Sequence, residues 1–304
     1  KVKTFKTIFP AVSVPLNDDY SINEPEFRAY LRWIKTFYGK GMDGLVCNGH
    51  TGEITGLTRA ERKRVVEICA EECGDVMTII SGVNCENTAE SIEMAKEAKE
   101  AGADGILLMP PHMWLRFGMN PDAPFEYVKD VAEGADIDII IHLYPATSKA
   151  FYPVETLIKM CKEIDHVKCI KMGTRVTSIY EHDVRLLRQE CQDISLITCH
   201  DETLCVSWFP GMDGALIGFA GCVPEIICPA REVFANPDKH TLKEAQDWSD
   251  RIYHISQAIY GGGQPSGEAH ARLKEALKQR GIFSSALMRK PVLPLNQEEK
   301  DWVA

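Results

Sequence analysis

Short apolar runs alternate with longer stretches of mixed polar and apolar residues from the start of the chain to about Val223. Each run has the length of a strand, and each is followed by a stretch long enough for a helix. The runs predict eight strands, at residues 7–16, 44–49, 76–83, 105–111, 138–145, 167–173, 195–200 and 214–219.

Helix-start signals stand between several of these runs. Thr58 and Glu61 form the Thr-x-x-Glu pattern of a capping box, and Asn87 stands in the equivalent place three residues before a glutamate. Asn23 precedes Pro25, which is typical of a first helical turn. These signals predict helices that connect the strands.

The joint between helix and strand is repeated. The sequence Gly-Met-Asp-Gly occurs at residues 41–44 and 211–214, and Gly-Ala-Asp-Gly occurs at residues 102–105. In each case a glycine suited to a helix C-cap ends a helical stretch, and an apolar run follows. Eight strand–helix units joined in this way predict an α/β fold, a (β/α)8 TIM barrel rather than an open sheet.

Beyond about Val223 the pattern contains helices only. We expect helices over residues 241–260 and 267–280, a short one near Gln297, and a turn over the Gly- and Pro-containing residues 261–266. The predicted organisation is a barrel over residues 1–235 and a C-terminal helical segment over residues 236–304 that packs on it.

Composition excludes several classes of protein. The 304 residues include 34 Lys and Arg against 44 Asp and Glu, and the net charge of −10 argues against a nucleic-acid partner. No apolar run approaches the roughly 20 residues of a membrane helix, so we expect a cytoplasmic protein without membrane contact. Eleven cysteines occur without a Cys-x-x-Cys spacing, and we expect buried, reduced thiols.

Lys171 is the strongest candidate for a catalytic residue, because the catalytic groups of such barrels lie at the carboxyl ends of the strands. Period-2 alternation puts Val167, Cys169 and Lys171 on one face of the run, with Lys168 and Ile170 on the other. If the first two fill the barrel, Lys171 points into its mouth. Burial there lowers the pKa of an amine toward the range in which it attacks a carbonyl. A lysine that only makes a structural ion pair is the alternative.

Two further positions can serve the same site. Tyr144 lies on the same face of its run as His142, and a phenol there can carry a proton, although a ring that caps the core fits equally well. The turn Gly-His-Thr-Gly-Glu at residues 49–53 offers backbone N–H groups and the Thr51 hydroxyl, which suit a carboxylate.

Motifs along nearly the whole chain point to a known family. They are Gly-His-Thr-Gly-Glu at residues 49–53, Leu-Thr-Arg-Ala-Glu-Arg at 57–62, Ser-Gly-Val-Asn at 81–84, Asn-Thr-Ala-Glu at 87–90, Ala-Gly-Ala-Asp-Gly at 101–105, Met-Pro-Pro at 109–111 and Arg-Lys-Pro-Val-Leu-Pro-Leu at 289–295. With Tyr144 and Lys171 in the same order and spacing, the chain resembles the dihydrodipicolinate synthase / N-acetylneuraminate lyase family. These motifs are specific to the superfamily and not to a substrate.

The resemblance implies a barrel with a C-terminal helical segment, commonly a homotetramer, that acts as a class I lyase or aldolase. Its partners would be pyruvate or a longer 2-oxo acid and an aldehyde. Lys171 would form the imine, Tyr144 would shuttle the proton, and Thr51 and the backbone around His50 would hold the carboxylate. Gly218, in the last run, is included in this substrate-binding set. No metal or organic cofactor is expected.

Departures from the family pattern bear on the substrate. His50 stands where the family's turn often has Ser or Thr, so one hydroxyl of the proton relay is missing. His112 stands where the synthases place a tyrosine. Lys149 stands where they carry an arginine for the carboxylate of the second substrate, and it lacks the bidentate fork of arginine. These departures argue against dipicolinate synthesis.

Two substrate classes remain open. The loop that contains His112 and Trp114 offers an aromatic wall, and it resembles the hydratase-aldolases that cleave aryl-substituted 2-oxo acids. His50, His112 and His200 could instead bind the hydroxyls of a sugar-derived 2-keto-3-deoxy acid, which the same imine could cleave or dehydrate.

Two other kinds of function are kept as alternatives. His50, His112, His142 and His200 all stand near strand ends and could ligate a metal for hydrolysis or a class II aldol reaction, although no His-x-His spacing occurs. The chain could also be catalytically silent and bind a 2-oxo acid as a sensor or scaffold, which the presence of both a lysine and a tyrosine disfavours.

Overall fold

The computed structural model describes residues 1–261 and 266–304 and confirms the predicted barrel. Its eight parallel strands are hydrogen-bonded in the order β1-β8-β7-β6-β5-β4-β3-β2. A parallel bridge between Ala11 and Val46 joins the two end strands, so the ring is almost closed. The strands are β1 (Ile8–Pro10), β2 (Gly44–Cys47), β3 (Thr78–Val83), β4 (Gly105–Leu108), β5 (Asp138–Leu143), β6 (Val167–Met172), β7 (Ser195–Thr198) and β8 (Gly214–Ile217).

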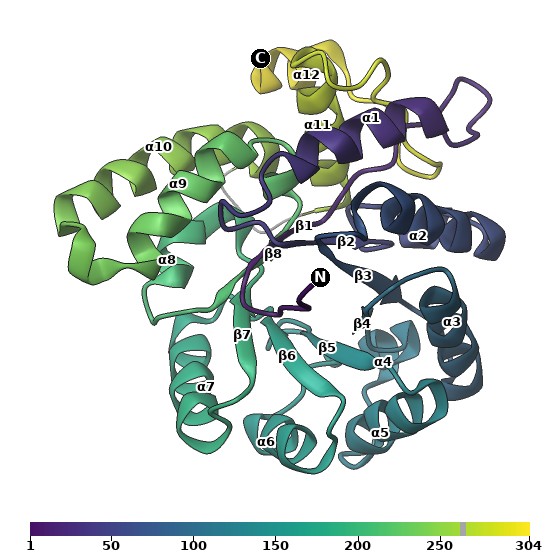
Figure 1. Ribbon diagram of the computed structural model, residues 1–304, viewed down its shortest axis with the longest axis vertical. Helices are drawn as coiled ribbons and strands as arrows, with labels where there is room; N and C mark the ends of the chain where they lie inside the picture. Colours follow the sequence, from purple (N-terminus) through teal and green to yellow (C-terminus); the bar gives the residue numbers. More distant parts are fainter. Residues whose placement is uncertain (262–265) are drawn as a thin grey trace.

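Helices surround the strands, as Figure 1 shows, and α10 to α12 lie together at one side of the barrel. The predicted turn at residues 261–266 is described only at its two ends, since residues 262–265 lie outside the described part. The helices are α1 (Glu24–Lys35), α2 (Arg59–Cys73), α3 (Thr88–Glu100), α4 (His112–Phe117), α5 (Ala123–Ala135), α6 (Val154–Glu163), α7 (Thr177–Glu190), α8 (Leu204–Trp208), α9 (Pro224–Ala235), α10 (Leu242–Tyr260), α11 (Gly267–Gln279) and α12 (Gln297–Val303).

The predicted helix starts are confirmed. Thr58 and Glu61 form a complete capping box at α2, and the side chains of Asn23 and Asn87 accept hydrogen bonds from backbone N–H groups in the first turns of α1 and α3. Each cap satisfies a donor that the helix itself leaves without a partner. The local sequence therefore determines where these three helices begin.

The first strand is shorter than predicted. It ends at Pro10, whereas the apolar run continues to Leu16. Beyond Pro10 the run pairs through the isolated bridge between Ala11 and Val46, and Pro15, which has no N–H to donate, cannot extend the pairing. The remaining residues of the run are buried.

The interior of the barrel is filled by a ring of side chains, one from each strand. Residues that alternate with them pack outward against the helices, as expected for a TIM barrel. The ring consists of Phe9, Val46, Ile80, Leu107, Ile140, Cys169, Ile197 and Leu216.

A bulge in β6 corrects one detail of the predicted alternation. Ile139 of β5 pairs with Val167, but the next residue, Ile140, pairs with Cys169, so Lys168 is an extra residue in the strand. Val167 consequently packs in the outer cluster, whereas Cys169 faces the interior as predicted. The alternation from Cys169 to Lys171 is unaffected.

The N-terminal segment covers the amino end of the barrel. Phe5 packs against the interior ring, and its backbone carbonyl accepts a hydrogen bond from Ser195 at the start of β7. Figure 1 shows this segment crossing in front of the strands. The opposite end, where the strands terminate, is the end available for a ligand.

A buried ion pair attaches the C-terminal segment to the barrel. Lys274 of α11 is 1% exposed, and its Nζ lies 2.7 Å from Glu53 in the turn after β2. Lys274 also donates to the carbonyl of Leu287, and Glu53 accepts from the backbone N–H of Arg289. Glu53 therefore joins the turn at residues 49–53 to the C-terminal segment.

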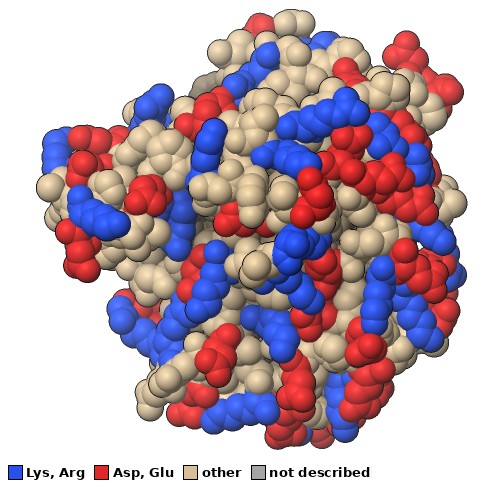
Figure 2. Space-filling view, in the orientation of Figure 1, with Lys and Arg blue, Asp and Glu red and all other residues tan. Residues whose placement is uncertain are grey.

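The cysteines and the surface charges agree with what the composition predicts, which is reduced thiols and no basic surface. All eleven cysteines are free, and only Cys161 is partly exposed. Acidic and basic side chains are interspersed over the face shown in Figure 2, so that face offers no continuous basic surface for a nucleic acid. Within the described ranges, no helix combines the length and the apolar character needed to cross a bilayer.

Replacing one member of the buried pair tests its contribution to stability. Lys274→Ala leaves the Glu53 carboxylate buried without its partner, and we expect a loss of about 3 kcal/mol or more, measured as a lower midpoint of thermal unfolding. Lys278→Ala, on the exposed face of the same helix, should change stability by less than about 0.5 kcal/mol. Equal midpoints for the two variants would show that the pair contributes little.

Candidate active site

A cavity of about 340 Å³ opens at the carboxyl ends of the strands. Its wall includes side chains or backbone from the ends of several strands and from the start of α11. Five of the residues predicted to form the site line this cavity: His50, Thr51, Tyr144, Lys171 and Gly218.

Lys171 projects from β6 between two neighbouring strands. Its Cα is paired with His142 of β5 on one side and with Ile197 of β7 on the other. Because Cys169 belongs to the interior ring, the side chain two residues later also points inward. Burial lowers the pKa of the Lys171 amine, although the fields of Cys199 and Asp201 act in the opposite direction.

Tyr144 lies beside His50 in the same cavity. The phenol oxygen is 3.3 Å from Nε2 of the imidazole, and this contact joins the end of β5 to the turn after β2. Burial raises the pKa of the Tyr144 phenol, so this group keeps its proton at neutral pH. Burial, reinforced by the charge of Lys171, lowers the pKa of His50 to about 3. The pair is therefore an uncharged phenol against an uncharged imidazole.

The turn at residues 49–53 is held in an unusual backbone conformation. Asn48 and Glu53 on either side of it have positive φ angles of 53° and 59°. Thr51 lies so close to Gly218 that a Cβ at that glycine would be 2.7 Å from the Thr51 hydroxyl oxygen. Only glycine permits this approach, which holds the hydroxyl at the mouth of the barrel.

Three imidazoles stand on the cavity wall. His142 and His50 have ring centres 5.5 Å apart, and His270 reaches the cavity from α11. Among the described residues, Nδ1 of His142 has no hydrogen-bond partner. Burial lowers the pKa of His142 and brings that of His270 to about 4. All three rings are neutral near pH 7.

His270 was not predicted from the sequence. It belongs to a helix that lies almost one hundred residues beyond Lys171, and no strand-end position marks it. Its neighbour Glu268 and the helical pattern around it give the local sequence the character of a solvent-exposed helix start. Only the packing of α11 on the barrel brings the ring to the site.

Asp201 and Arg175 complete the charged groups of the wall, and both were missed as site residues. Asp201 accepts hydrogen bonds from the backbone N–H of Phe219 and the hydroxyl of Tyr260, and burial raises its pKa to about 6. Arg175 donates to Glu202 at 2.7 Å. The strand-end position of residues 198–202 is a signal that could have drawn attention to Asp201 and Glu202.

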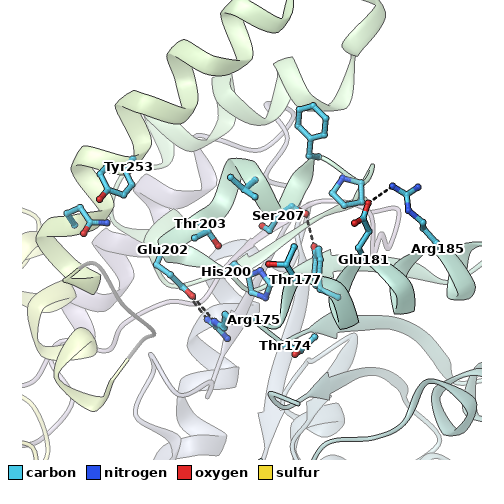
Figure 3. A pocket seen from close by; sticks show the side chains of 15 residues that line it. Thr174, Arg175, Thr177, Glu181, Arg185, His200, Glu202, Thr203, Ser207 and Tyr253 are labelled. Carbon is cyan, nitrogen blue, oxygen red and sulfur yellow. Dashed lines mark hydrogen bonds and ion pairs between the residues drawn. The ribbon is translucent and has the colours of Figure 1, made fainter. Parts of the chain in front are cut away.

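His200 lies in a second cavity, of about 560 Å³, and not in the one that holds Lys171. Figure 3 shows its ring beside the Arg175–Glu202 pair, and Arg175 lines both cavities. Alternation past the end of β7 turns His200 away from the barrel axis, while the next residue, Asp201, faces the Lys171 cavity. The predicted contact of His200 with the same substrate therefore lacks support from the lining.

His112, Trp114 and Lys149 also lie outside the lining of the Lys171 cavity. His112 lies 3.1 Å from the side-chain nitrogen of Asn84, and Lys149 donates to the backbone carbonyl of Arg116. The indole of Trp114 packs edge-on against two tyrosines, Tyr127 and Tyr152. His112 and Trp114 belong to the short helix α4, and Trp114 also packs against the interior cluster that includes Tyr144.

The four histidines considered as metal ligands are not brought together. His50 and His142 share one cavity, whereas His200 lines the other and His112 lies beside Asn84. Over residues 1–261 and 266–304, no group of three or more His, Cys, Asp and Glu side chains is arranged to hold a metal ion. The metal-dependent alternative therefore has no donor set in the described residues.

Comparison with known proteins gives matches over almost the whole chain. The 4-hydroxy-tetrahydrodipicolinate synthase of Bartonella bacilliformis is 26% identical over 298 residues, which cover 97% of this chain and 95% of the relative. An uncharacterized DapA-like lyase of Pyrococcus horikoshii is 30% identical over 294 residues, covering 96% of this chain and 95% of the relative.

Solved structures show the same fold. YagE, a prophage protein of the dihydrodipicolinic acid synthase family from E. coli K12 in complex with pyruvate, matches with a TM-score of 0.87 at 20% identity, covering 98% of this chain and 96% of its own. Dihydrodipicolinate synthase from Aquifex aeolicus gives a TM-score of 0.86 at 19% identity, with coverage of 98% and 96%.

The family model described as the dihydrodipicolinate synthetase family matches residues 4–304. This match includes every strand and helix of the barrel and the C-terminal segment. The chain therefore belongs to the dihydrodipicolinate synthetase family, as the motifs in its sequence predict.

Proposed function

We propose that this chain is a class I lyase that binds a 2-oxo acid as an imine on Lys171 and makes or breaks the C3–C4 bond of that acid. The observation that carries the proposal is the common cavity of Lys171 and Tyr144, at the end of the barrel where such enzymes act. The lowered pKa of the amine supports it, because only the unprotonated amine attacks a carbonyl.

The reaction begins when Lys171 Nζ attacks the C2 carbonyl, and loss of water leaves the imine. The protonated imine accepts the electron pair of the C3–C4 bond as that bond breaks, the proton of the C4 hydroxyl passes to the Tyr144–His50 pair, and an aldehyde leaves. Protonation of the resulting enamine at C3 and hydrolysis release pyruvate and restore the amine. The reverse sequence is an aldol condensation, and loss of a C3 proton followed by a C4 hydroxide from the same imine is a dehydration.

We assign to Tyr144 the transfer of the proton between the substrate and the protein. Its phenol is protonated at neutral pH and lies against His50, which is an uncharged acceptor and donor. We assign to Thr51, which lies beside Gly218, the binding of the substrate carboxylate.

Relatives support a 2-oxo acid as the imine partner. Several carry the name 4-hydroxy-tetrahydrodipicolinate synthase, and YagE was solved in complex with pyruvate. We do not extend the dipicolinate reaction itself to this chain. Lys149, which replaces the arginine expected of those synthases, is directed at the Arg116 carbonyl outside the cavity lining.

Trapping with borohydride tests the imine directly. Incubation with pyruvate and borohydride should add a reduced pyruvyl group to Lys171, located by peptide mass spectrometry. Lys171→Met should carry no adduct, whereas Lys168→Met, at the bulge of the same strand, should be modified like the wild type. A wild-type protein without a mass increase would remove the proposal.

Replacing the phenol separates proton transfer from imine formation. Tyr144→Phe should still be trapped by borohydride, while turnover with an aldol substrate falls on the order of 100-fold or more, as for a general acid or base. Near-normal turnover of the variant would contradict the role given to Tyr144.

The pH dependence of trapping reports the state of the amine. Burial lowers the Lys171 pKa from its ordinary value of 10.5, so the reactive, unprotonated fraction should rise with pH and level off below that value. The rate of adduct formation, measured against a free lysine derivative in the same buffers, should show its inflection at lower pH. Coincident inflections would show that the protein does not activate the amine.

A further inference from the structure

His270 brings the C-terminal segment into the Lys171 cavity at a defined position. It lies four residues before Lys274 on α11, so both side chains project from one side of the helix. Because Lys274 is bound to Glu53 in the turn after β2, the rotation and the register of α11 are fixed relative to the barrel. The ring of His270 is therefore held at the cavity by a buried anchor.

The part of the wall that His270 belongs to is polar but uncharged. Burial and the nearby charge of Lys171 lower the pKa of His270 to about 4 and of His50 to about 3, and they act on His142 in the same direction. Each neutral imidazole offers one donor and one acceptor. Such groups suit alcohols, which both donate and accept hydrogen bonds.

The cavity offers little to a second anionic group. Lys171 and Arg175 are the cations among its described lining residues, and Lys171 is the reacting amine. Arg175 already donates to Glu202 and to the backbone carbonyls of Gly173 and Cys199. A second carboxylate or phosphate would have to displace those partners.

The tryptophan predicted to form an aromatic wall is not part of this cavity. The indole of Trp114 is packed against Tyr127 and Tyr152 and does not line the cavity. The volume of the cavity, about 340 Å³, is near the lower end of the roughly 300–1,000 Å³ typical of small-molecule sites. With three imidazoles on its wall, the cavity suits a short hydroxylated chain.

We propose that His270 is a specificity-determining residue that hydrogen-bonds an uncharged hydroxyl on the part of the substrate beyond the reacting carbons. The substrate class is then a hydroxylated 2-oxo acid, and the aldehyde that it releases or accepts is a short hydroxyaldehyde. This inference rests on the proposed imine chemistry and selects between the two substrate classes that the sequence leaves open.

The test compares aldehydes that differ in their hydroxyl groups. Pyruvate condensation with D-glyceraldehyde, with butanal and with benzaldehyde is measured as kcat/KM for the aldehyde, using the full chain. The wild type should prefer glyceraldehyde. His270→Leu should lower the value for glyceraldehyde about tenfold, the scale of one hydrogen bond, and leave the value for butanal within about twofold. His270→Asn, which keeps a donor and an acceptor, should recover part of the loss.

His254→Leu is the matched control, because His254 is an exposed histidine of the neighbouring helix α10. It should behave as the wild type with all three aldehydes. An equal fall for glyceraldehyde and butanal in His270→Leu would assign the residue a structural role and overturn the proposal. A wild-type preference for benzaldehyde or butanal would overturn it as well.

Borohydride trapping with pyruvate distinguishes a failure of the specificity inference from a failure of the proposed imine chemistry. If wild-type protein forms the Lys171 adduct but shows no preference for the hydroxyaldehyde, the specificity inference fails and the imine chemistry stands. If it forms no adduct, the proposed function fails, and the role of His270 in that reaction fails with it.

Discussion

Removal of water from around the Lys171 amine is the constraint on which the rest of the site depends. An ammonium group in a barrel interior has lost most of its hydration, and it is stable there only if other groups replace that hydration. The second buried lysine, Lys274, has such groups in the Glu53 carboxylate and the Leu287 carbonyl. For Lys171, burial outweighs the fields of Cys199 and Asp201, so the balance moves toward the neutral amine.

The same constraint explains why the histidines around the amine are neutral. A positive charge on Lys171 opposes protonation of His50, His142 and His270, and each of these pKa values is lowered by that field as well as by burial. In the proposed reaction, a substrate carboxylate would add a negative charge beside that of Asp201. Binding of a 2-oxo acid and protonation of the proposed imine would then favour each other electrostatically, while the uncharged rings remain free for hydrogen bonds.

The repeated strand–helix pattern was enough to predict the architecture, because each of its signals is local. Turn glycines, capping boxes and strand-length apolar runs act within a few residues, and Thr58 and Asn87 begin their helices as expected. Lys171 could be placed for a similar reason, since two residues of alternation separate it from Cys169. Val167 could not, because the bulge depends on how β6 pairs with β5 and is not visible in either strand alone.

The parts of the site that could not be predicted from the sequence are those formed by packing between distant segments. Trp114 packs edge-on against Tyr127 and Tyr152, and His200 and its neighbour Asp201 line two different cavities that share Arg175. Strand-end position alone predicts proximity to the mouth of the barrel, but it does not predict which of two adjacent cavities a side chain enters.

The role of the C-terminal segment follows from the same kind of long-range contact. A helix packed on the outside of a barrel could be expected to act only on stability, yet α11 carries both an anchor and a wall residue of the cavity. Glu53, the partner of Lys274, is two residues from Thr51 and three from His50, so the turn that lines the cavity and the helix that carries His270 are positioned by one ion pair. The helical segment is thus a structural part of the active site, and the geometry of the two sides of the cavity is coupled.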